Sequence, residues 1–514
     1  MKLSLSFATS SIMLTSLLGF SAGLLSQENA HGHHQRYKLI DVGTFGGPQG
    51  YVNPEGNGGP YINHSGMIVG NTQTATPLPV NTDPFICYPG PNVNHAFVAR
   101  GNRTVDLGAL EPSEDNCSDA LGINDHGEIA GQSSTSEFDP LLGVNQMRAV
   151  VWKNGKIEDL GTFGGNESGA TSVNNRGQVT GFALNDVPDP YSIFGYFFLG
   201  SPNSTQTRAF IWKDGVMRDI GTLGGNDAQV FPGYINERGQ VAGISYTNTV
   251  PNAATGLPTI DPFLWDGHKM IDLGTLGGHG GFAAALNNRG EVVGNSNTAG
   301  DTGTHPFFWS NGVITDLGTF GGNFGDGNDL NDNGEVVGDG NFPGDQIRHA
   351  FLWSHGYKKD LGVLPGDKCS TASAINSRGQ IVGLSGMCGF GIRAFIWERG
   401  EMANLNDLVF PKSDVILVEP TVISDDGKIG VNGLPPGCDN GDVCGHPYLL
   451  IPDGDCDDDL SARITADQSI PSETAKYLTP QNDQATKTDA VKTTMDRLRV
   501  RMQRKLRNTG GGLP

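Results

Sequence analysis

Histidine and arginine recur at one fixed place along the chain, just before short aromatic runs. Histidine occupies this place at His95, His305, His349 and His446. Arginine occupies it at Arg148, Arg208 and Arg393. A histidine side chain can ligate a metal or transfer a proton, whereas arginine can only donate hydrogen bonds. The exchange of the two residue types therefore predicts a structural hydrogen-bond donor at this place, and no metal site is assigned.

An Asp-x-Gly marker is equally regular and supplies a set of carboxylates. It falls at Asp41, Asp106, Asp159, Asp219, Asp272, Asp316 and Asp360, with Asn404 in the last copy. Carboxylates can perform acid–base chemistry or bind calcium. An aspartate that accepts backbone N–H groups of the glycine loop after it explains the regularity better. The tryptophans share one repeat position, which predicts packing between neighbouring sheets: Trp152, Trp212, Trp265, Trp309, Trp353 and Trp397.

These residues belong to a repeated unit that is clearest from His305 to Arg348. Its aromatic run leads into Asn311-Gly312, a dipeptide suited to a two-residue hairpin because both positions need φ > 0. A second short run follows, and Gly321-Gly322 ends it. A third run leads to the turn Asn331–Gly334, and a fourth closes a second hairpin. Two hairpins per unit without a helical period predict a four-stranded antiparallel sheet.

The unit occurs eight times, which predicts an all-β propeller of eight four-stranded blades over residues 37–452. The Asn-x-x-Gly turn starts at Asn63, Asn124, Asn174, Asn236, Asn287, Asn331 and Asn376, and Ser424 opens a divergent eighth copy. The first unit begins with only a fourth strand, Tyr37–Gly43, and the last unit ends with only a third strand, His446–Ile451. We expect these two segments to pair and close the ring. Seven blades or an open array of β-repeats are the alternatives.

Insertions fall at one place in the unit, before the aromatic run, and we expect them on one face of the ring. The largest insertion, 182–207, contains an aromatic stretch that strand alternation cannot bury completely. This stretch comprises Tyr191, Phe194, Tyr196, Phe197 and Phe198. With Tyr246 from the neighbouring insertion 244–260, it is predicted to bind a glycan or protein partner. The alternative is a satellite hydrophobic cluster.

Seven cysteines and an apolar N-terminus indicate an exported protein. Residues 1–30 have the layout of a secretory signal peptide, so we expect an extracellular, periplasmic or cell-surface location. Proximity in the expected ring pairs Cys87 with Cys117, Cys369 with Cys388, and Cys438 with Cys444. Cys456 is then left free or joined to another molecule.

Beyond the repeats, residues 453–514 read as an acidic and polar disordered tail. Asp453, Asp455 and Asp457 could hold calcium, although their cluster lacks the glycine and final glutamate of an EF-hand. A basic amphipathic helix is predicted at about 486–507, which could dock on the ring, lie on a membrane or self-associate. The formal charge of −21 disfavours nucleic acid as a partner. No second stretch is long enough to span a bilayer.

The motifs His349-Ala-Phe-Leu-Trp353, Asp360-Leu-Gly362 and Asn376-x-x-Gly379 together resemble the HAF repeat of bacterial extracellular proteins. The resemblance covers about residues 37–452 and implies export and a propeller-like repeat fold. It implies no activity, no cofactor and no catalytic residue for this chain.

Two functions follow as alternatives. The favoured one is a non-enzymatic binding or scaffold protein, because no nucleophile elbow, His-Glu-x-x-His or phosphate-loop spacing occurs. The other is a polysaccharide hydrolase or lyase. It would use Asp119, Asp326 or Asp329 near the axis as a carboxylate pair about 5–10 Å apart. The sequence sets neither the ligand nor the oligomeric state.

Overall fold

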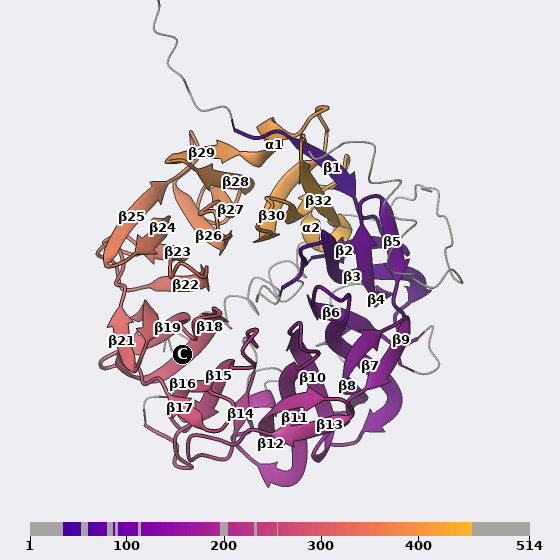
Figure 1. Cartoon of the computed structure of the whole chain (residues 1–514), viewed down its shortest axis with the longest axis vertical. Coiled ribbons are helices and arrows are strands. Elements are labelled where there is room, and N and C mark those ends of the chain that lie inside the picture. Colours follow the sequence, from indigo (N-terminus) through magenta and orange to yellow (C-terminus); the bar gives the residue numbers. More distant parts are fainter. Residues whose placement is uncertain are drawn as a thin grey trace, which may run out of the picture. The chain divides into compact units, whose positions relative to one another are not determined.

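The computed structural model describes residues 34–52, 60–79, 86–87, 91–110, 115–195, 204–230, 234–253 and 255–454. Within them, the chain forms eight successive groups of four antiparallel strands, which follow one another around a common axis (Figure 1). Six groups are separate sheets, and groups four and five are joined into one sheet by a single parallel pair between Ile260 and Gly280. The predicted all-β propeller of four-stranded blades is therefore confirmed. The expected signal peptide and the tail beyond Gly454 lie outside the described residues.

The first four blades each take four consecutive strands of the chain. Blade 1 has β2 (Gly46–Tyr51), β3 (Met67–Pro77), β4 (Asn92–Arg100) and β5 (Arg103–Asp106). Blade 2 has β6 (Ser118–Ile123), β7 (Ile129–Asp139), β8 (Val144–Lys153) and β9 (Lys156–Asp159). Blade 3 has β10 (Gly164–Val173), β11 (Val179–Asp189), β12 (Ser204–Lys213) and β13 (Val216–Asp219). Blade 4 has β14 (Ala228–Gln229), β15 (Val241–Tyr246), β16 (Ile260–Trp265) and β17 (Met270–Asp272).

The second half repeats the pattern. Blade 5 has β18 (Gly277–Leu286), β19 (Val292–Thr298), β20 (Thr304–Ser310) and β21 (Val313–Asp316). Blade 6 has β22 (Gly325–Leu330), β23 (Val336–Asn341), β24 (Arg348–Ser354) and β25 (Tyr357–Gly362). Blade 7 has β26 (Cys369–Ile375), β27 (Ile381–Gly386), β28 (Arg393–Glu398) and β29 (Glu401–Asn404). Blade 8 has β30 (Ile416–Ile423), β31 (Ile429–Leu434), β32 (His446–Pro452) and the N-terminal β1 (Tyr37–Asp41). The short helix α1 (Leu405–Leu408) precedes β30, and the short helix α2 (Gly441–Cys444) precedes β32.

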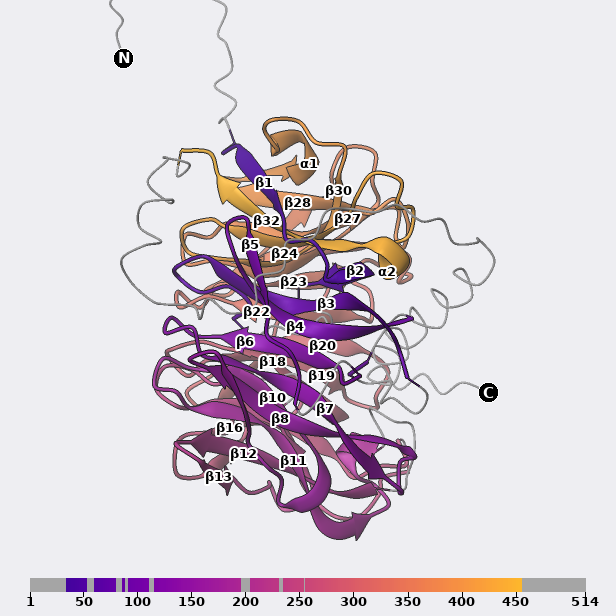
Figure 2. The same ribbon diagram turned by 90° about the vertical axis from the view of Figure 1, so that its right-hand side faces the viewer.

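The N-terminal strand completes the last blade, as the order of the repeats predicts. β1 pairs antiparallel with β32, with Tyr37 opposite Pro452 and Asp41 opposite Tyr448. On the other side, blade 1 bonds to blade 8, because Asn432 Oδ1 accepts from the Val52 N–H at 2.9 Å. Helix α2 lies beside β2 (Figure 2), and its Gly441 carbonyl accepts from the Tyr51 hydroxyl. The two ends of the repeat array are therefore held together by strand pairing and by side-chain bonds.

Six blades bury an aromatic residue of the third strand opposite a glycine of the second. Blade 2 has Val150 opposite Gly131, and blade 8 has Tyr448 opposite Val431. Phe307 is fully buried and lies opposite Gly294. A β-carbon on Gly294 would lie 1.9 Å from the carbonyl oxygen of Phe282, because the inner strand has a register shift between Ala283 and Ala285. The glycine is thus required by the close approach of the bulged inner strand.

The Asp-x-Gly carboxylates are structural, as predicted. In blade 6, Asp360 Oδ1 accepts from the Gly362 N–H at 2.7 Å, and His349 Nδ1 lies 3.0 Å from the same oxygen. In blade 3, the place of the histidine is taken by Arg208, whose Nε donates to Asp219 at 2.8 Å. Both residue types therefore fix the carboxylate that organises the loop, which explains the exchange in the sequence. The tryptophans are packing residues, and five of the six are buried.

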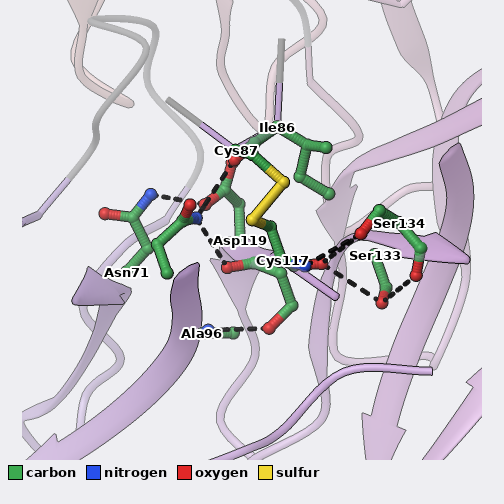
Figure 3. Close-up of a disulfide and its surroundings, with 10 residues drawn as sticks. Asn71, Ile86, Cys87, Ala96, Cys117, Asp119, Ser133 and Ser134 are labelled. Atoms are coloured by element: carbon green, nitrogen blue, oxygen red, sulfur yellow. Dashed lines mark hydrogen bonds between the residues drawn. A yellow bond between two sulfur atoms is a disulfide. The ribbon is translucent and has the colours of Figure 1, made fainter. Parts of the chain in front are cut away.

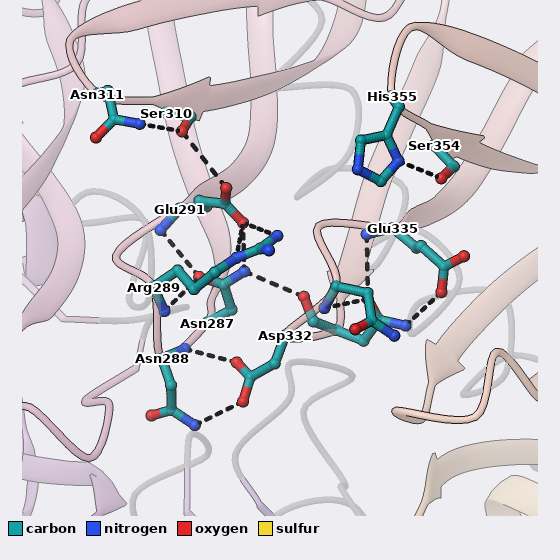
Figure 4. Close-up of polar contacts among 12 residues, drawn as sticks. Asn287, Asn288, Arg289, Glu291, Ser310, Asn311, Asp332, Glu335, Ser354 and His355 are labelled. Atoms are coloured by element: carbon teal, nitrogen blue, oxygen red, sulfur yellow. Dashed lines mark hydrogen bonds and ion pairs between the residues drawn. The ribbon is translucent and has the colours of Figure 1, made fainter.

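The asparagine that opens each inner turn connects its blade to the next one. In blade 5, Asn287 Oδ1 accepts from the N–H groups of Arg289 and Glu291, so the side chain closes its own turn. Its Nδ2 donates to the carbonyl of Asn331 in blade 6 at 3.1 Å. Figure 4 shows this contact region, where Asn288 also donates its N–H to Asp332 at 2.8 Å. We call the Nδ2 bond a rung.

Seven consecutive rungs join the eight turns. They run Asn63–Asn124, Asn124–Asn174, Asn174–Asn236, Asn236–Asn287, Asn287–Asn331, Asn331–Asn376 and Asn376–Ser424, at 2.9–3.1 Å. All seven asparagines are buried. A hydrogen bond between buried groups is costly to break because neither partner can turn to water.

Replacing Asn236 by serine should lower the free energy of unfolding by about 1–2 kcal/mol, because a buried carbonyl loses its donor. Serine can still close the turn, as Ser424 does by accepting the Lys428 N–H, so the change isolates the rung. Chemical denaturation measures the effect. The control is Asn333→Ser, whose exposed Nδ2 bond to Ser377 should contribute less than about 0.5 kcal/mol. Equal losses in the two variants would contradict a special role for the rung.

Candidate functional site

Two of the aromatic residues predicted to bind a partner, Phe194 and Tyr246, are core residues, which contradicts an exposed surface at these two positions. Phe194 and Tyr246 are fully buried, and Tyr191 is partly buried in the same cluster as Tyr246. The Tyr246 hydroxyl donates to the Tyr191 carbonyl at 2.8 Å. Tyr196, Phe197 and Phe198 lie outside the described residues. The satellite hydrophobic cluster is therefore the correct alternative for Phe194 and Tyr246.

Phe194 shares a hydrophobic cluster with a disulfide. Its ring centroid lies 5.4 Å from that of Phe182, and both belong to the cluster that contains Cys87 and Cys117. Figure 3 shows this disulfide beside Asp119. Residues from the insertions of blades 1 and 3 thus meet in one apolar cluster with Cys117 and Met147 of blade 2, which explains why Phe194 is buried. All three predicted disulfides, Cys87–Cys117, Cys369–Cys388 and Cys438–Cys444, are confirmed.

The circle of rungs is interrupted where blade 8 meets blade 1. Ser424 stands where the other turns have asparagine, so its side chain carries no amide N–H to donate toward the Asn63 carbonyl. Instead, the Ser424 hydroxyl bonds to Asp426 within its own turn. Among the described residues, the Asn63 carbonyl accepts only the Gly66 N–H, whereas the Asn124 carbonyl accepts both the Gly127 N–H and the Asn63 side chain. We call the gap between these two turns the seam.

A cavity of about 750 Å³ lies at the seam. Its apolar lining comes from Pro60, Ile62, Val422 and Ile423, and its polar lining from Asn63, His64, Arg378, Ser424, Asp425 and Asp426. A second cavity, about 190 Å³, lies between the extended hairpins of blades 2 and 3 and includes Asp139, Leu141 and Ser204. The larger cavity is thus on the face of the tight Asn-x-x-Gly turns.

The acids considered for an enzyme are held by the protein itself. Asp119 is buried and accepts from the side-chain amides of Asn71 and Asn94. Asp329 accepts from the N–H groups of Leu330 and Ile375, and burial raises its pKa to about 7. Asp326 faces Asp339 across β22 and β23. None of the three lines either of the two cavities, so no carboxylate pair is assigned to a substrate site.

Some charged side chains at the seam bond to other groups of the protein, and one does not within the described residues. Asp426 pairs with Lys428, and Asp425 Oδ1 accepts from the Ser377 N–H at 2.9 Å. His64 Nδ1 lies 2.9 Å from Asp125, while its Nε2 is 4.0 Å from Asp425. The hydrogen bond to Asp125, with the nearby charges of Asp425 and Asp426, raises the pKa of His64 above its usual value. The Arg378 guanidinium has no hydrogen bond or ion pair among the described residues, so its donors face the cavity and solvent.

The predicted calcium site lies mostly outside the described residues. Of its acids, only Asp453 is described, and its N–H donates to the Arg36 carbonyl. Asp455 and Asp457 are outside the described part. Within the described ranges, no group of three or more His, Cys, Asp or Glu side chains is placed to hold a metal ion. None of the helices in those ranges is long and apolar enough to cross a bilayer.

Comparisons with known proteins identify structures of similar shape and no family. No family model matches the chain, and no curated protein sequence matches it. The β-propeller domain of the Trilobed protease from Pyrococcus furiosus is similar, with 8% identity, a TM-score of 0.38, and coverage of 64% of this chain and 94% of that chain. The acylaminoacyl peptidase of Pyrococcus horikoshii is similar with 12% identity, a TM-score of 0.37, and coverage of 77% and 59%. Dipeptidyl peptidase 4 of Porphyromonas gingivalis shows 10% identity, a TM-score of 0.37, and coverage of 68% and 56%. No activity is carried over from these proteins.

One signal in the sequence marks the seam. Ser424 is the single departure from asparagine among eight otherwise equivalent turns, and the same turn contributes Asp425 and Asp426 to the cavity. The length variation of the insertions is a stronger signal in the sequence than this one substitution.

Replacing Phe194 by alanine should destabilise the protein by about 3–5 kcal/mol, since it empties a buried aromatic site beside a disulfide. The control is Phe138→Ala in β7, whose side chain is half exposed and should change stability by less than about 0.5 kcal/mol. Thermal or denaturant unfolding measures both variants. A Phe194→Ala protein as stable as the control would restore the exposed-surface interpretation.

His64 should stabilise the seam only while it is protonated. Because its pKa is raised in the folded state, its contribution is fully present below the unfolded pKa of about 6.5 and is lost as the pH rises through the folded pKa. The difference in thermal midpoint between wild type and His64→Ala should therefore be positive at about pH 5.5 and shrink by about pH 8.5. The control is His268→Ala, an exposed histidine without an ion pair in the described residues. A difference that grows with pH would contradict this account.

Proposed function

We propose that the protein is an exported, non-enzymatic binding scaffold that takes a saccharide in the seam cavity. The observation that carries the proposal is the interruption of the seven-rung series, which opens a cavity at the one interface where Ser424 replaces asparagine. The other seven interfaces are joined by buried amide bonds. A rigid ring whose interface between blades 8 and 1 lacks a rung among the described residues presents its ligand groups in a fixed arrangement, which lowers the entropy cost of binding.

The lining of the seam cavity suits a sugar ring. Saccharides present hydroxyl groups at their edges and patches of C–H on their faces. The Asp425 carboxylate can accept from hydroxyl groups, and the Arg378 guanidinium and the His64 imidazole can donate to them. Ile62 and Val422 offer apolar surface for a C–H face. The polar groups include both charge signs, so a neutral ligand is favoured over a highly charged one.

Export is supported by two features of the chain. Three disulfides join cysteines in the described residues, and such bonds persist in oxidising compartments. The apolar stretch within residues 1–30 has the composition of a signal peptide. The resemblance to the HAF repeat of bacterial extracellular proteins points in the same direction and remains a prediction.

A glycan array followed by titration calorimetry tests the proposal. Arg378→Ala and Asp425→Asn should each weaken binding of the best array ligand at least about tenfold, the usual effect of removing a hydrogen bond to a charged group. The matched control is Arg238→Ala, which changes the same turn position in blade 4, away from the seam. Its guanidinium donates to the Arg289 carbonyl, so it should leave affinity unchanged.

Thermal unfolding separates binding from stability, because Arg378 is exposed and its side chain makes no hydrogen bond or ion pair within the described residues. The Arg378→Ala midpoint should match that of wild type. An array without any saccharide signal, or equal binding losses for Arg378→Ala and Arg238→Ala, would overturn the proposal. Turnover of the bound saccharide would instead favour the hydrolase or lyase alternative.

A further inference from the structure

We infer that the seam cavity selects saccharides that carry an N-acetyl group, because an acetamido group can supply the rung that Ser424 cannot. This inference rests on the proposed saccharide-binding function. It adds a specific chemical class of ligand and assigns its recognition to two main-chain groups at the seam.

The seven intact rungs define what the missing group must provide. At each of them, a carboxamide N–H donates to the carbonyl of the next turn, for example from Asn236 to Asn287 at 3.0 Å. At the seam, the corresponding carbonyl belongs to Asn63, which lines the cavity. It keeps its bond to Gly66 within the turn and lacks a second donor among the described residues. A ligand that places an N–H group there restores the arrangement found elsewhere around the axis.

A second set of bonds, beside the rungs, also lacks a partner at the seam. The residue after each turn asparagine commonly donates its N–H to a side chain of the following turn. His64 donates to Asp125 at 3.0 Å, and Asp125 donates to Asn175 at 2.8 Å. The equivalent N–H at the seam belongs to Asp425, and the side chain expected to accept it is His64. Within the described residues, the Asp425 N–H has no hydrogen-bond acceptor, so it can donate to a ligand carbonyl.

An acetamido group contains both complementary hydrogen-bonding groups, an N–H donor and a C=O acceptor, in one planar unit. Its N–H would donate to the Asn63 carbonyl, and its C=O would accept from the Asp425 N–H. Its methyl group would contact apolar lining such as Ile62 and Val422. A hydroxyl or a protonated amine at the same sugar carbon offers a donor but no carbonyl or methyl group. A site that hydrogen-bonds a ligand group disfavours a ligand that lacks this group. Of the two residues that supply the main-chain groups here, Asn63 is buried and Asp425 is exposed.

Titration calorimetry with the full chain tests the inference with defined probes. Chitotetraose, an oligomer of N-acetylglucosamine, should bind at least about tenfold more tightly than its deacetylated counterpart and than cellotetraose, which have the same linkage. The use of both comparison probes separates the loss of the acetyl group from the gain of positive charge.

Ser424→Asn restores the protein's own rung and competes with the ligand for the Asn63 carbonyl. This variant should lose the preference for acetylated probes and most of its affinity for them, and its thermal midpoint should rise. Ser424→Ala is the matched control, since it also removes the hydroxyl but adds no amide, and it should keep the preference. The thermal midpoint confirms that both variants are folded.

The outcomes distinguish this inference from the proposed function. Tight saccharide binding at the seam with equal affinity for acetylated and non-acetylated probes would overturn the acetamido inference and leave the binding function intact. Unchanged chitotetraose binding by Ser424→Asn would also overturn the inference. Failure of every saccharide to bind would overturn both. Selective binding that disappears in Ser424→Asn and persists in Ser424→Ala is the result that the inference requires.

Discussion

The bond from an asparagine side-chain amide to the next turn's carbonyl is the interaction on which the inner part of the structure depends. Each asparagine closes its own turn through Oδ1 and reaches the following blade through Nδ2, so a single buried side chain sets both the turn and the spacing between blades. A hydrophobic contact could not fix this spacing as sharply, since apolar packing is not directional. The regularity of the turns in the sequence follows from this double requirement.

Closure of the ring uses different contacts, and this explains the seam. The two ends of the repeat array are joined by the pairing of β1 with β32, by Asn432 bonded to Val52, and by α2 beside β2. These contacts hold blades 8 and 1 together without a rung between their inner turns. Serine is therefore tolerated at position 424, and the space freed by the absent amide becomes part of the cavity.

Most of the architecture could be predicted from the sequence because the repeat multiplies each weak signal eightfold. The Asn-Gly hairpins, the alternating strands and the incomplete first and last units together indicated four-stranded blades and their closure. The same comparison separated structural residues from candidates: the exchange of His349 for Arg208 at equivalent positions indicated a donor, and both bond to the Asp-x-Gly carboxylate. Repetition also explains why the three disulfides could be paired.

The site was harder to predict because burial of an insertion is a tertiary property. Phe194 and Tyr246 belong to insertions whose composition suggests an exposed surface, yet they pack with residues from other insertions and blades. The seam, in contrast, results from an amide group that is missing at Ser424. The consequence of this missing group appears only when the two ends of the chain are brought together. His64, Arg378 and Asp425 are far apart in sequence and carry no motif.

A crystal structure of the protein with bound chitotetraose tests the central claim most directly. We predict electron density for one sugar at the seam, with its acetamido nitrogen within about 3.2 Å of the Asn63 carbonyl oxygen, the distance of an N–H···O hydrogen bond. The acetamido oxygen should lie at a similar distance from the Asp425 nitrogen. Density on the face that carries the insertions, or a sugar at the seam whose acetamido group points to solvent, would contradict the account.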